Sequence, residues 1–176
     1  MPFANESRIE LRRFELEAAF REHTELWEAW KLVESKAQPL SATAGVFLAG
    51  VFAYASQKAS ELLLMERCLL VFLSLLLLAS VFQALRSIWV VSAPSPHLGT
   101  KGAEEVDWII EKTLPPDSYG SRFELLIADT ARRWLEVCDD LQPKLDRKSK
   151  LLVSGLRYLA ASGLVAVALI AVTLAR

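Results

Sequence analysis

Few residues of this chain have the types and spacing that catalysis or metal binding requires. The two cysteines, Cys68 and Cys138, have no histidine near them in the sequence, and the chain has only two histidines. The paired acids are typical of solvated helix faces, and no base accompanies them; they are Glu104 with Glu105 and Asp139 with Asp140. The sequence has no glycine-rich phosphate loop and no zinc-ligand spacing. We therefore expect no enzyme, no metal site and no bound cofactor.

The composition excludes several classes of protein. Of 176 residues, 53% are apolar and 23% are charged, which rules out a disordered tail or a collagen-like fibre. The mean hydropathy of +0.29 is high for a soluble domain. The net charge is −1, so no basic excess suggests nucleic acid as a partner. Two cysteines cannot form a disulfide framework.

Three stretches of the chain carry no charged residue. They are residues 37–57, 68–85 and 158–175, of 21, 18 and 18 residues. Each is close to the roughly 20 residues that a helix needs to cross the hydrocarbon core of a bilayer. A soluble bundle would need other helices to cover three apolar ones, and the remaining long helical stretches are amphipathic and strongly charged. The sequence therefore predicts an all-α membrane protein with three transmembrane helices, a hairpin plus a C-terminal span.

The basic residues that flank these stretches predict the topology. Residues 1–36 contain no apolar core of the signal-peptide type. Eight basic residues would share one side of the membrane, and these are Lys31, Lys36, Arg86, Lys144, Arg147, Lys148, Lys150 and Arg157. Three would lie on the other side, and these are Lys58, Arg67 and Arg176. The imbalance predicts a multi-pass protein with a cytoplasmic N-terminus and a periplasmic C-terminus.

Five segments follow from this pattern. Residues 1–36 form a cytoplasmic amphipathic helix that opens with a capping box, Ser7 to Glu10, and residues 37–91 form the transmembrane hairpin. Residues 92–120 are a loop rich in proline and glycine, with one short helix around Val106, Trp108, Ile109 and Ile110. Residues 121–149 form a second cytoplasmic amphipathic helix, which opens with Ser121 to Glu124 and which Pro143 ends or kinks. Residues 150–176 form the third span.

Both amphipathic helices have an apolar seam with four-three spacing. The first comprises Leu16, Phe20, His23, Trp27 and Trp30, and the second comprises Phe123, Ile127, Thr130, Trp134, Val137 and Leu141. We expect the seams to pack together, with His23 a packed residue and no metal ligand. Two alternatives stay open for the first helix, a coiled coil between copies and a helix lying on the membrane surface.

Two further patterns concern the membrane. Small residues recur at every fourth position of the first span, at Ser41, Gly45, Ala49 and Ala53, and such a track lets another helix approach closely. We expect this face to contact protein. Before the third span lies a basic collar of Lys144, Arg147, Lys148 and Lys150. We interpret the collar as an interfacial anchor, with binding of an anionic lipid headgroup or a nucleotide as the alternative.

The residues around the first span resemble a known family. Glu34, Lys36 and Ala37, followed by Leu40 and Gly45, are similar to the pattern of the Pycsar transmembrane effector family, although that family usually has aspartate where this chain has Glu34. The layout is also similar, because the last span of that family is introduced by a lysine and hydrophobic residues. Here these are Lys148 or Lys150 with Leu151 and Leu152. The related SLATT membrane proteins share the plan of a hairpin plus a helix.

The resemblance implies a role in antiviral defence. A partner cyclase would make cyclic UMP or cyclic CMP on phage infection, and the effector would then oligomerise and impair the inner membrane. The implied partners are the lipid bilayer, further copies of the chain and the cyclic nucleotide, whose binding residues are unknown. The alternative is a non-toxic membrane adaptor that tethers a soluble partner through its cytoplasmic helices. Four tryptophans could anchor such a partner, although core packing suits each of them too; they are Trp27, Trp30, Trp108 and Trp134.

Overall fold

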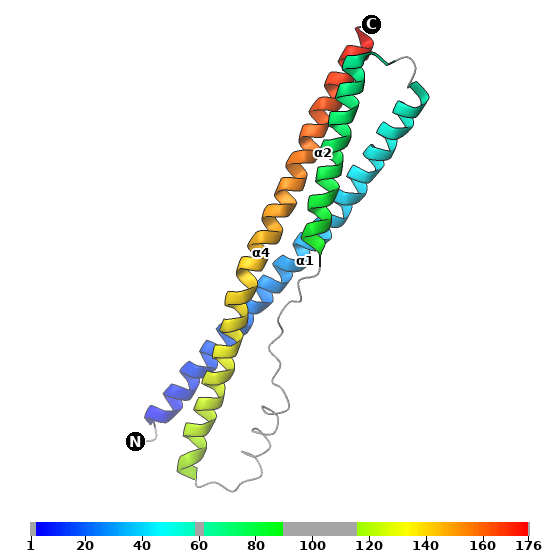
Figure 1. The fold of residues 1–176 in the computed structure, drawn as a ribbon. Helices are drawn as coiled ribbons and strands as arrows, with labels where there is room; N and C mark the ends of the chain where they lie inside the picture. The colour runs from blue at the N-terminus through cyan, green and yellow to red at the C-terminus, as the bar shows by residue number, and fades with distance from the viewer. Residues whose placement is uncertain (1–2, 59–61, 90–115, 176) are drawn as a thin grey trace. The chain divides into compact units, whose positions relative to one another are not determined.

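The computed structural model describes residues 3–58, 62–89 and 116–175, which form three helices (Figure 1). Helix α1 spans Phe3–Lys58, α2 spans Leu64–Ile88 and α4 spans Pro116–Leu174. Within these ranges the chain has no strand, so the predicted all-helical class is confirmed.

Each of the three helices is long and apolar enough to cross a membrane, by length and composition. Two of the charge-free stretches lie wholly within a helix, residues 37–57 in α1 and 68–85 in α2, and α4 contains the third, 158–175, except for its last residue. This arrangement indicates a multi-pass membrane protein.

Helices α1 and α4 continue through points where the sequence suggested a boundary. Helix α1 contains Pro39, and α4 contains Pro143, so the expectation that Pro143 could end the helix is wrong. Each proline removes one backbone hydrogen bond. Both proline rings are exposed, however, while Leu40 and Leu141 close to them are buried. Packing on the opposite side therefore holds each helix together across its proline.

Both long helices also begin earlier than the capping boxes predicted. Helix α1 begins at Phe3 and α4 at Pro116, so Ser7 and Ser121 lie inside helices and do not cap them. Proline suits the first helical position because its fixed backbone angle matches the helix and its missing N–H needs no partner there. Residues 116–120 consequently belong to α4 and not to the loop. The short helix expected around Val106 lies outside the described residues.

The chain divides into two compact units, and α1 and α4 contribute to both. Unit 1 comprises residues 1–29 and 92–144, and unit 2 comprises residues 30–91 and 145–176.

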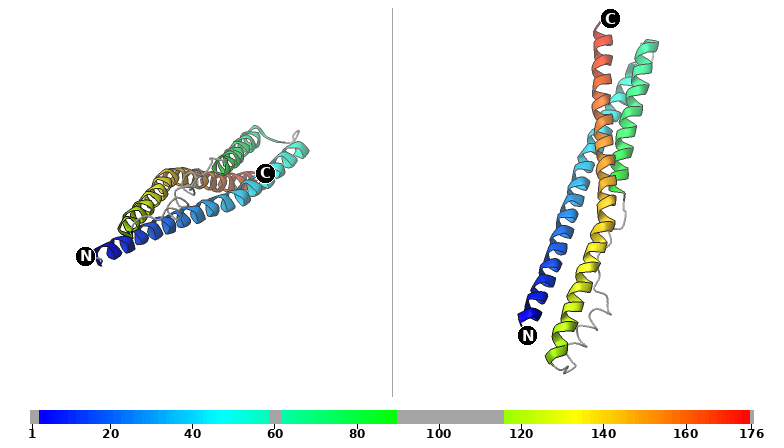
Figure 2. Two further views of the ribbon diagram at one scale, coloured as in Figure 1. Left: turned by 90° about the horizontal axis from the view of Figure 1, so that it is seen from below. Right: turned by 90° about the vertical axis from the view of Figure 1, so that its left-hand side faces the viewer.

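In unit 1, α1 and α4 lie side by side and run in the same direction (Figure 2). An ion pair joins Arg8 to Glu124, and further along the pair the Cys138 thiol contacts the Ala19 carbonyl oxygen at 3.9 Å. The buried residues of this pair are Ala19, Ile127, Ala131, Cys138 and Leu141.

The two predicted apolar seams contact each other in unit 1. The closest packing between the helices, however, partly involves residues next to the predicted ones. The Trp134 ring contacts the rings of Phe20 and His23 edge-on, at centroid distances of 5.3 and 4.7 Å. Phe20 is nevertheless 55% exposed, and its neighbour Ala19 is buried. In α4, Ala131 and Cys138 are buried more deeply than Thr130 and Val137 beside them. Small residues lie at the centre because two helices approach most closely where side chains are short, which pushes the large rings to the edge.

Unit 2 is a three-helix arrangement in which α2 runs opposite to α1 and α4. One buried cluster comprises Ala37, Leu40, Ala84 and Leu152, and a second comprises Ala44, Leu73 and Leu77. From the first cluster to the second, the residue numbers rise on α1 and fall on α2. The two helices are therefore antiparallel and form a hairpin. The partly buried Leu159 packs against both clusters, so α4 fills the groove between the other two helices.

Candidate functional site

A charged cluster joins α1 to α4 in unit 2. Lys148 Nζ donates a hydrogen bond to Glu34 Oε1 at 2.6 Å, and Trp30 Nε1 donates to the same oxygen at 2.8 Å. Lys148 Nζ also lies 3.6 Å from the centroid of the Trp30 ring. A single carboxylate oxygen thus links two helices through residues that are 114 positions apart in sequence. We call this group the Trp30–Glu34–Lys148 cluster.

The cluster is largely removed from water. The side chain of Lys148 is 5% exposed and that of Glu34 is 35% exposed, while Trp30 is 4% exposed. An ammonium group buried to this degree is costly unless it is paired. The carboxylate supplies the opposite charge, and the face of the indole ring adds a cation–π attraction. The three side chains therefore stabilise one another only while they remain together.

The same helix faces carry the cluster and the apolar core. Glu34 lies one turn after Trp30, and Ala37 continues that face of α1 into the core. On α4, Leu152 follows Lys148 by one turn and packs in the same apolar cluster as Ala37. Residues four apart share one side of a helix. The charged pair therefore lies at one end of the apolar contact between α1 and α4.

A second tight contact joins all three helices of unit 2 at Gly155. The Ser80 hydroxyl donates a hydrogen bond to the Gly155 carbonyl oxygen at 2.9 Å, and both residues are buried. A Cβ atom at position 155 would lie 3.1 Å from Leu40 Cδ2 and 3.4 Å from the Ser80 carbonyl oxygen. The absent side chain therefore allows α4 to approach α1 and α2 closely.

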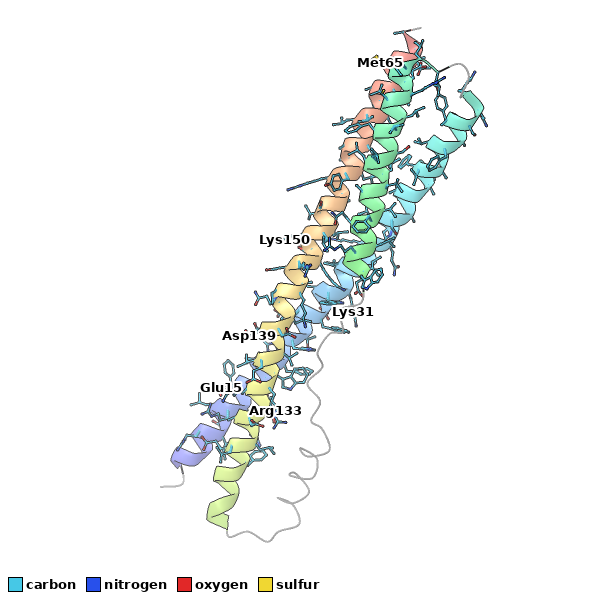
Figure 3. The ribbon with its side chains drawn as sticks, in the orientation of Figure 1. Glu15, Lys31, Met65, Arg133, Asp139 and Lys150 are labelled. Carbon is cyan, nitrogen blue, oxygen red and sulfur yellow. The ribbon has the colours of Figure 1, made fainter. Side chains whose placement is uncertain are left out.

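Most of the residues that carry the family resemblance gather around this cluster. Ala37 and Leu40 are buried beside it, and Glu34 and Lys148 form its ion pair. Lys36 and Lys150 are exposed, the latter on α4 as labelled in Figure 3. Of the two lysines left open by the sequence, Lys148 is the one that pairs with Glu34.

Among the residues that the structure describes, the small-residue track of α1 makes no close contact with another helix. A Cβ atom at Gly45 would meet nothing within 4 Å, and Ala49 and Ala53 are exposed. The Ser41 hydroxyl donates to the Gln38 carbonyl oxygen of its own helix at 2.8 Å. The intramolecular contact instead uses a neighbouring face, with Ala37, Leu40 and Ala44. Contact of the track with a second chain stays a prediction.

The basic collar does not form one surface patch. Lys144 Nζ pairs with Asp140 at 2.6 Å in unit 1. In unit 2, Arg147 and Lys150 are exposed, whereas Lys148 is buried in the cluster. Lys148 shares its helix face with Leu152, one turn further on, so it points into the packed side of α4. In this arrangement Lys148 is occupied by Glu34, and the role of the collar as an anchor or a binding site stays a prediction.

No family model, curated protein or solved structure matches this chain.

Burial shifts the pKa of two groups of unit 1, His23 and Cys138, toward their uncharged forms. His23 is partly buried against Trp134, and burial lowers its pKa from the ordinary value of 6.5. Burial raises the pKa of the Cys138 thiol, and the negative charges of Glu22 and Asp139 raise it further. A protonated, buried thiol is a poor nucleophile. Among the residues that the structure describes, no group of three or more His, Cys, Asp or Glu side chains could hold a metal ion.

The hydroxyl groups of the apolar stretches bond to backbone carbonyls. Ser74 donates to Leu70, Ser162 to Leu159 and Thr173 to Leu169, at 2.7–2.8 Å. Such bonds satisfy the hydroxyl within its own helix. These side chains therefore do not form a polar path through a single copy of the chain.

Gly155, Ser80 and the role of Trp30 were not identified from the sequence. A glycine in a helix interior costs about 1 kcal/mol relative to alanine, so Gly155 could have signalled a close contact. Trp30 was assigned to the amphipathic seam, because its spacing continues that pattern. Its bond to Glu34 lies within one helix, but the contact of its ring with Lys148 involves a distant segment, which a local pattern does not reveal.

Proposed function

We propose that this chain is a small integral membrane effector of bacterial antiphage defence. Its three helices cross the inner membrane, with the N-terminus in the cytoplasm and the C-terminus in the periplasm. Cyclic UMP or cyclic CMP from a partner cyclase triggers the chain to oligomerise and impair the membrane. The protein acts by assembly and catalyses no reaction.

The observation that carries the proposal is the ion pair between Glu34 and Lys148. The resemblance to the Pycsar effectors rests on an acidic residue before the first span and a lysine before the last. In this chain those two residues bond to each other at 2.6 Å. Two separate parts of the sequence pattern thus act as one structural unit, which supports reading them as a single motif.

The cluster provides a resting state for such an effector. Parting α1 from α4 at this point breaks the bond between Lys148 and Glu34 and the contact of Lys148 with the Trp30 ring. The pair therefore favours a closed arrangement of the two helices. A signal can shift that balance only if it binds the open arrangement more tightly than the closed one. Because α1 and α4 also build unit 1, a ligand or partner bound there acts on the same two helices.

Membrane potential in living cells tests the proposal. Cells that express the chain with a cognate cyclase, or with added cyclic UMP or cyclic CMP, should depolarise, and cells without nucleotide should not. Glu34→Lys and Lys148→Glu should each depolarise cells without nucleotide, and the double exchange should restore the resting state. Asp146→Asn, an exposed acid two residues from Lys148, serves as the control and should behave as wild type. Absence of depolarisation under every nucleotide condition would contradict the proposal.

A membrane adaptor is the second candidate, favoured by the exposed apolar side chains of unit 1. Leu11, Phe14 and Leu125 are 65%, 69% and 69% exposed. Two of the tryptophans expected to anchor a partner are occupied within the chain, since Trp30 belongs to the cluster and Trp134 packs on Phe20 and His23. An adaptor purified in detergent should retain a soluble partner in fixed stoichiometry, whereas an effector should be recovered alone or self-associated.

A further inference from the structure

The helix pair of unit 1 has an open groove along one side. The groove has a volume of about 540 Å³, and both α1 and α4 line it. Its walls include four alanines, Ala18 and Ala19 from α1 and Ala128 and Ala131 from α4. Short side chains on facing helices leave room for another helix to approach closely. The groove is therefore shaped for a helix and not for a flat surface.

Exposed apolar side chains border the groove on both helices. On α1, Leu11, Phe14 and Ala18 follow i, i+3, i+7 spacing and so share one face. On α4, Leu125 and Leu135 lie on the face that also carries Ala128. Phe14 and Leu135 line the groove directly and are 69% and 44% exposed. Large apolar side chains gathered on one side of two helices mark an interaction surface.

The charges at the groove are self-complementary. Glu15 on α1 and Arg132 on α4 both line it, with side chains 51% and 79% exposed. The contacts between Arg8 and Glu124 and between Ala19 and Cys138 fix the register of the two helices. In that register Glu15 and Arg132 lie at about the same level. The α1 side of the groove therefore offers an acid where the α4 side offers a base.

We propose that this groove is the docking site for a second copy of the chain. A two-fold axis along the helices sets α1 of one copy against α4 of the other, and the reverse, so that the same surface serves both copies. Each Glu15 then faces Arg132 of the other copy, and the apolar borders of the two grooves meet to form a parallel four-helix bundle. This names the surface for the assembly step of the proposed function and in that sense rests on it.

The chemistry of the groove disfavours two other occupants. Glu15 and Glu22 line it along with Arg12 and Arg132, so an anionic membrane surface gains no net attraction. A phosphate group would need a free guanidinium. Arg12 is already bonded to Glu15 at 2.7 Å and lies 3.9 Å from Glu124. Arg132 is likewise paired with Glu136 on its own helix, at 3.2 Å. A second copy adds a contact between Glu15 and Arg132 of opposite copies to these exposed pairs, so each charge keeps a partner of opposite sign.

Sedimentation equilibrium of the full-length chain in density-matched detergent tests the proposal, with no nucleotide present. Wild type should dimerise. Glu15→Arg and Arg132→Glu should each raise the dissociation constant of the dimer by about tenfold or more, because each places like charges opposite one another. The double exchange should restore association. Glu15→Arg also removes the bond between Arg12 and Glu15, and a change at Arg132 cannot restore that bond. Restored association in the double exchange would therefore show that Glu15 and Arg132 act at the interface.

Arg133→Glu is the matched control, because Arg133, like Arg132, pairs with an acid on its own helix but does not line the groove. It should leave the dissociation constant unchanged. A wild-type chain that is monomeric at every concentration would overturn the proposal, and would leave the groove to another part of the chain or to a soluble protein. An oligomer that resists both single reversals would also overturn it and would assign assembly to the apolar stretches. Neither result depends on depolarisation, so the proposed function and this inference can fail separately.

Discussion

At the scale of single residues, Glu34 and Lys148 differ in burial, so removing one partner should destabilise the protein more than removing the other. Lys148 is almost fully buried, whereas a third of the Glu34 side chain is in contact with solvent. Glu34→Gln therefore strands a buried ammonium group and should lower the free energy of unfolding by about 2–3 kcal/mol, below the range for a fully buried pair. Lys148→Met leaves a carboxylate that water can reach, and its cost should be smaller, about 1 kcal/mol.

Denaturant unfolding of the two variants in detergent, followed by circular dichroism, measures this asymmetry. Asp146→Asn should be neutral in the same assay. Equal losses for Glu34→Gln and Lys148→Met would contradict the asymmetric burial of the pair.

His23 gives unit 1 a dependence on pH. Because burial lowers its pKa in the folded state, the unfolded chain takes up the proton first as the pH falls below 6.5. The stability that the neutral ring contributes is present above pH 6.5 and is lost as the pH falls through the folded-state pKa. The melting temperature should thus fall between pH 7.5 and pH 5.5, and His23→Phe should reduce that fall.

Thermal unfolding by circular dichroism at the two pH values checks this expectation. His97→Gln controls for the second histidine of the chain and should keep the wild-type response. An unchanged pH response in His23→Phe would remove His23 as its source.

Single residues also mark the limit of what the sequence revealed. The resemblance singled out Glu34 and left Lys148 and Lys150 as equal candidates. The two lysines are two positions apart, which on a helix places them on different sides. Which side packs depends on the rotation of α4 against α1, and that rotation is set by Leu152, Gly155 and their distant contacts.

At the scale of elements, Gly155 is the position where helix packing is most sensitive to size. Gly155→Leu would place a side chain against Leu40 and Ser80, within 3.4 Å of atoms that belong partly to backbone. Overpacking of this kind should cost about 1–3 kcal/mol or more. Gly163→Leu, eight residues further along α4, adds the same side chain where nothing lies within 4 Å.

Unfolding in detergent should therefore separate the two variants, with Gly155→Leu destabilised and Gly163→Leu close to wild type. Gly45→Leu should also leave the fold of one copy intact, since its Cβ meets nothing within 4 Å. If Gly155→Leu proved as stable as Gly163→Leu, the close contact with α1 and α2 would be refuted.

The helices themselves were largely predictable, and their ends were not. Charge-free stretches and four-three spacing located every described helix, because a hydrophobic period needs no knowledge of partners. The helix boundaries predicted from Ser7 and Pro143 were wrong. Capping residues and prolines are weak local signals, and neighbouring turns and tertiary packing outweigh them. The choice of contact face in the first span was also missed, because the buried Leu40 and Ala44 each lie one position before a residue of the predicted track.

At the scale of the whole molecule, the predicted topology has a direct chemical test. Gln57 is exposed near the end of α1 and Gln142 is exposed on α4. In a chain whose native cysteines are replaced by alanine, Gln57→Cys should react with a membrane-impermeant maleimide in cells with a permeabilised outer membrane. Gln142→Cys should react only after the inner membrane is opened, because the basic residues predict a cytoplasmic location for it.

Labelling yields by gel shift, before and after inner-membrane lysis, give the result, with the cysteine-free chain as the blank. Reaction of both sites in intact cells, or the reverse order of reaction, would contradict the orientation. Recovery of the chain from plain buffer without detergent would contradict membrane insertion itself.

The parallel alignment of α1 and α4 has a consequence for how the protein is made. Glu34 and its partner are 114 residues apart, and ribosomes add about 5–20 residues per second. The newly made hairpin must therefore wait for on the order of ten seconds before Lys148 is synthesised. Throughout that interval a truncated product lacks the residue that closes the cluster. Ribosomal stalling before residue 148 would release chains in which Glu34 has no lysine partner and the hairpin lacks its third helix, and we expect membrane proteases to degrade them.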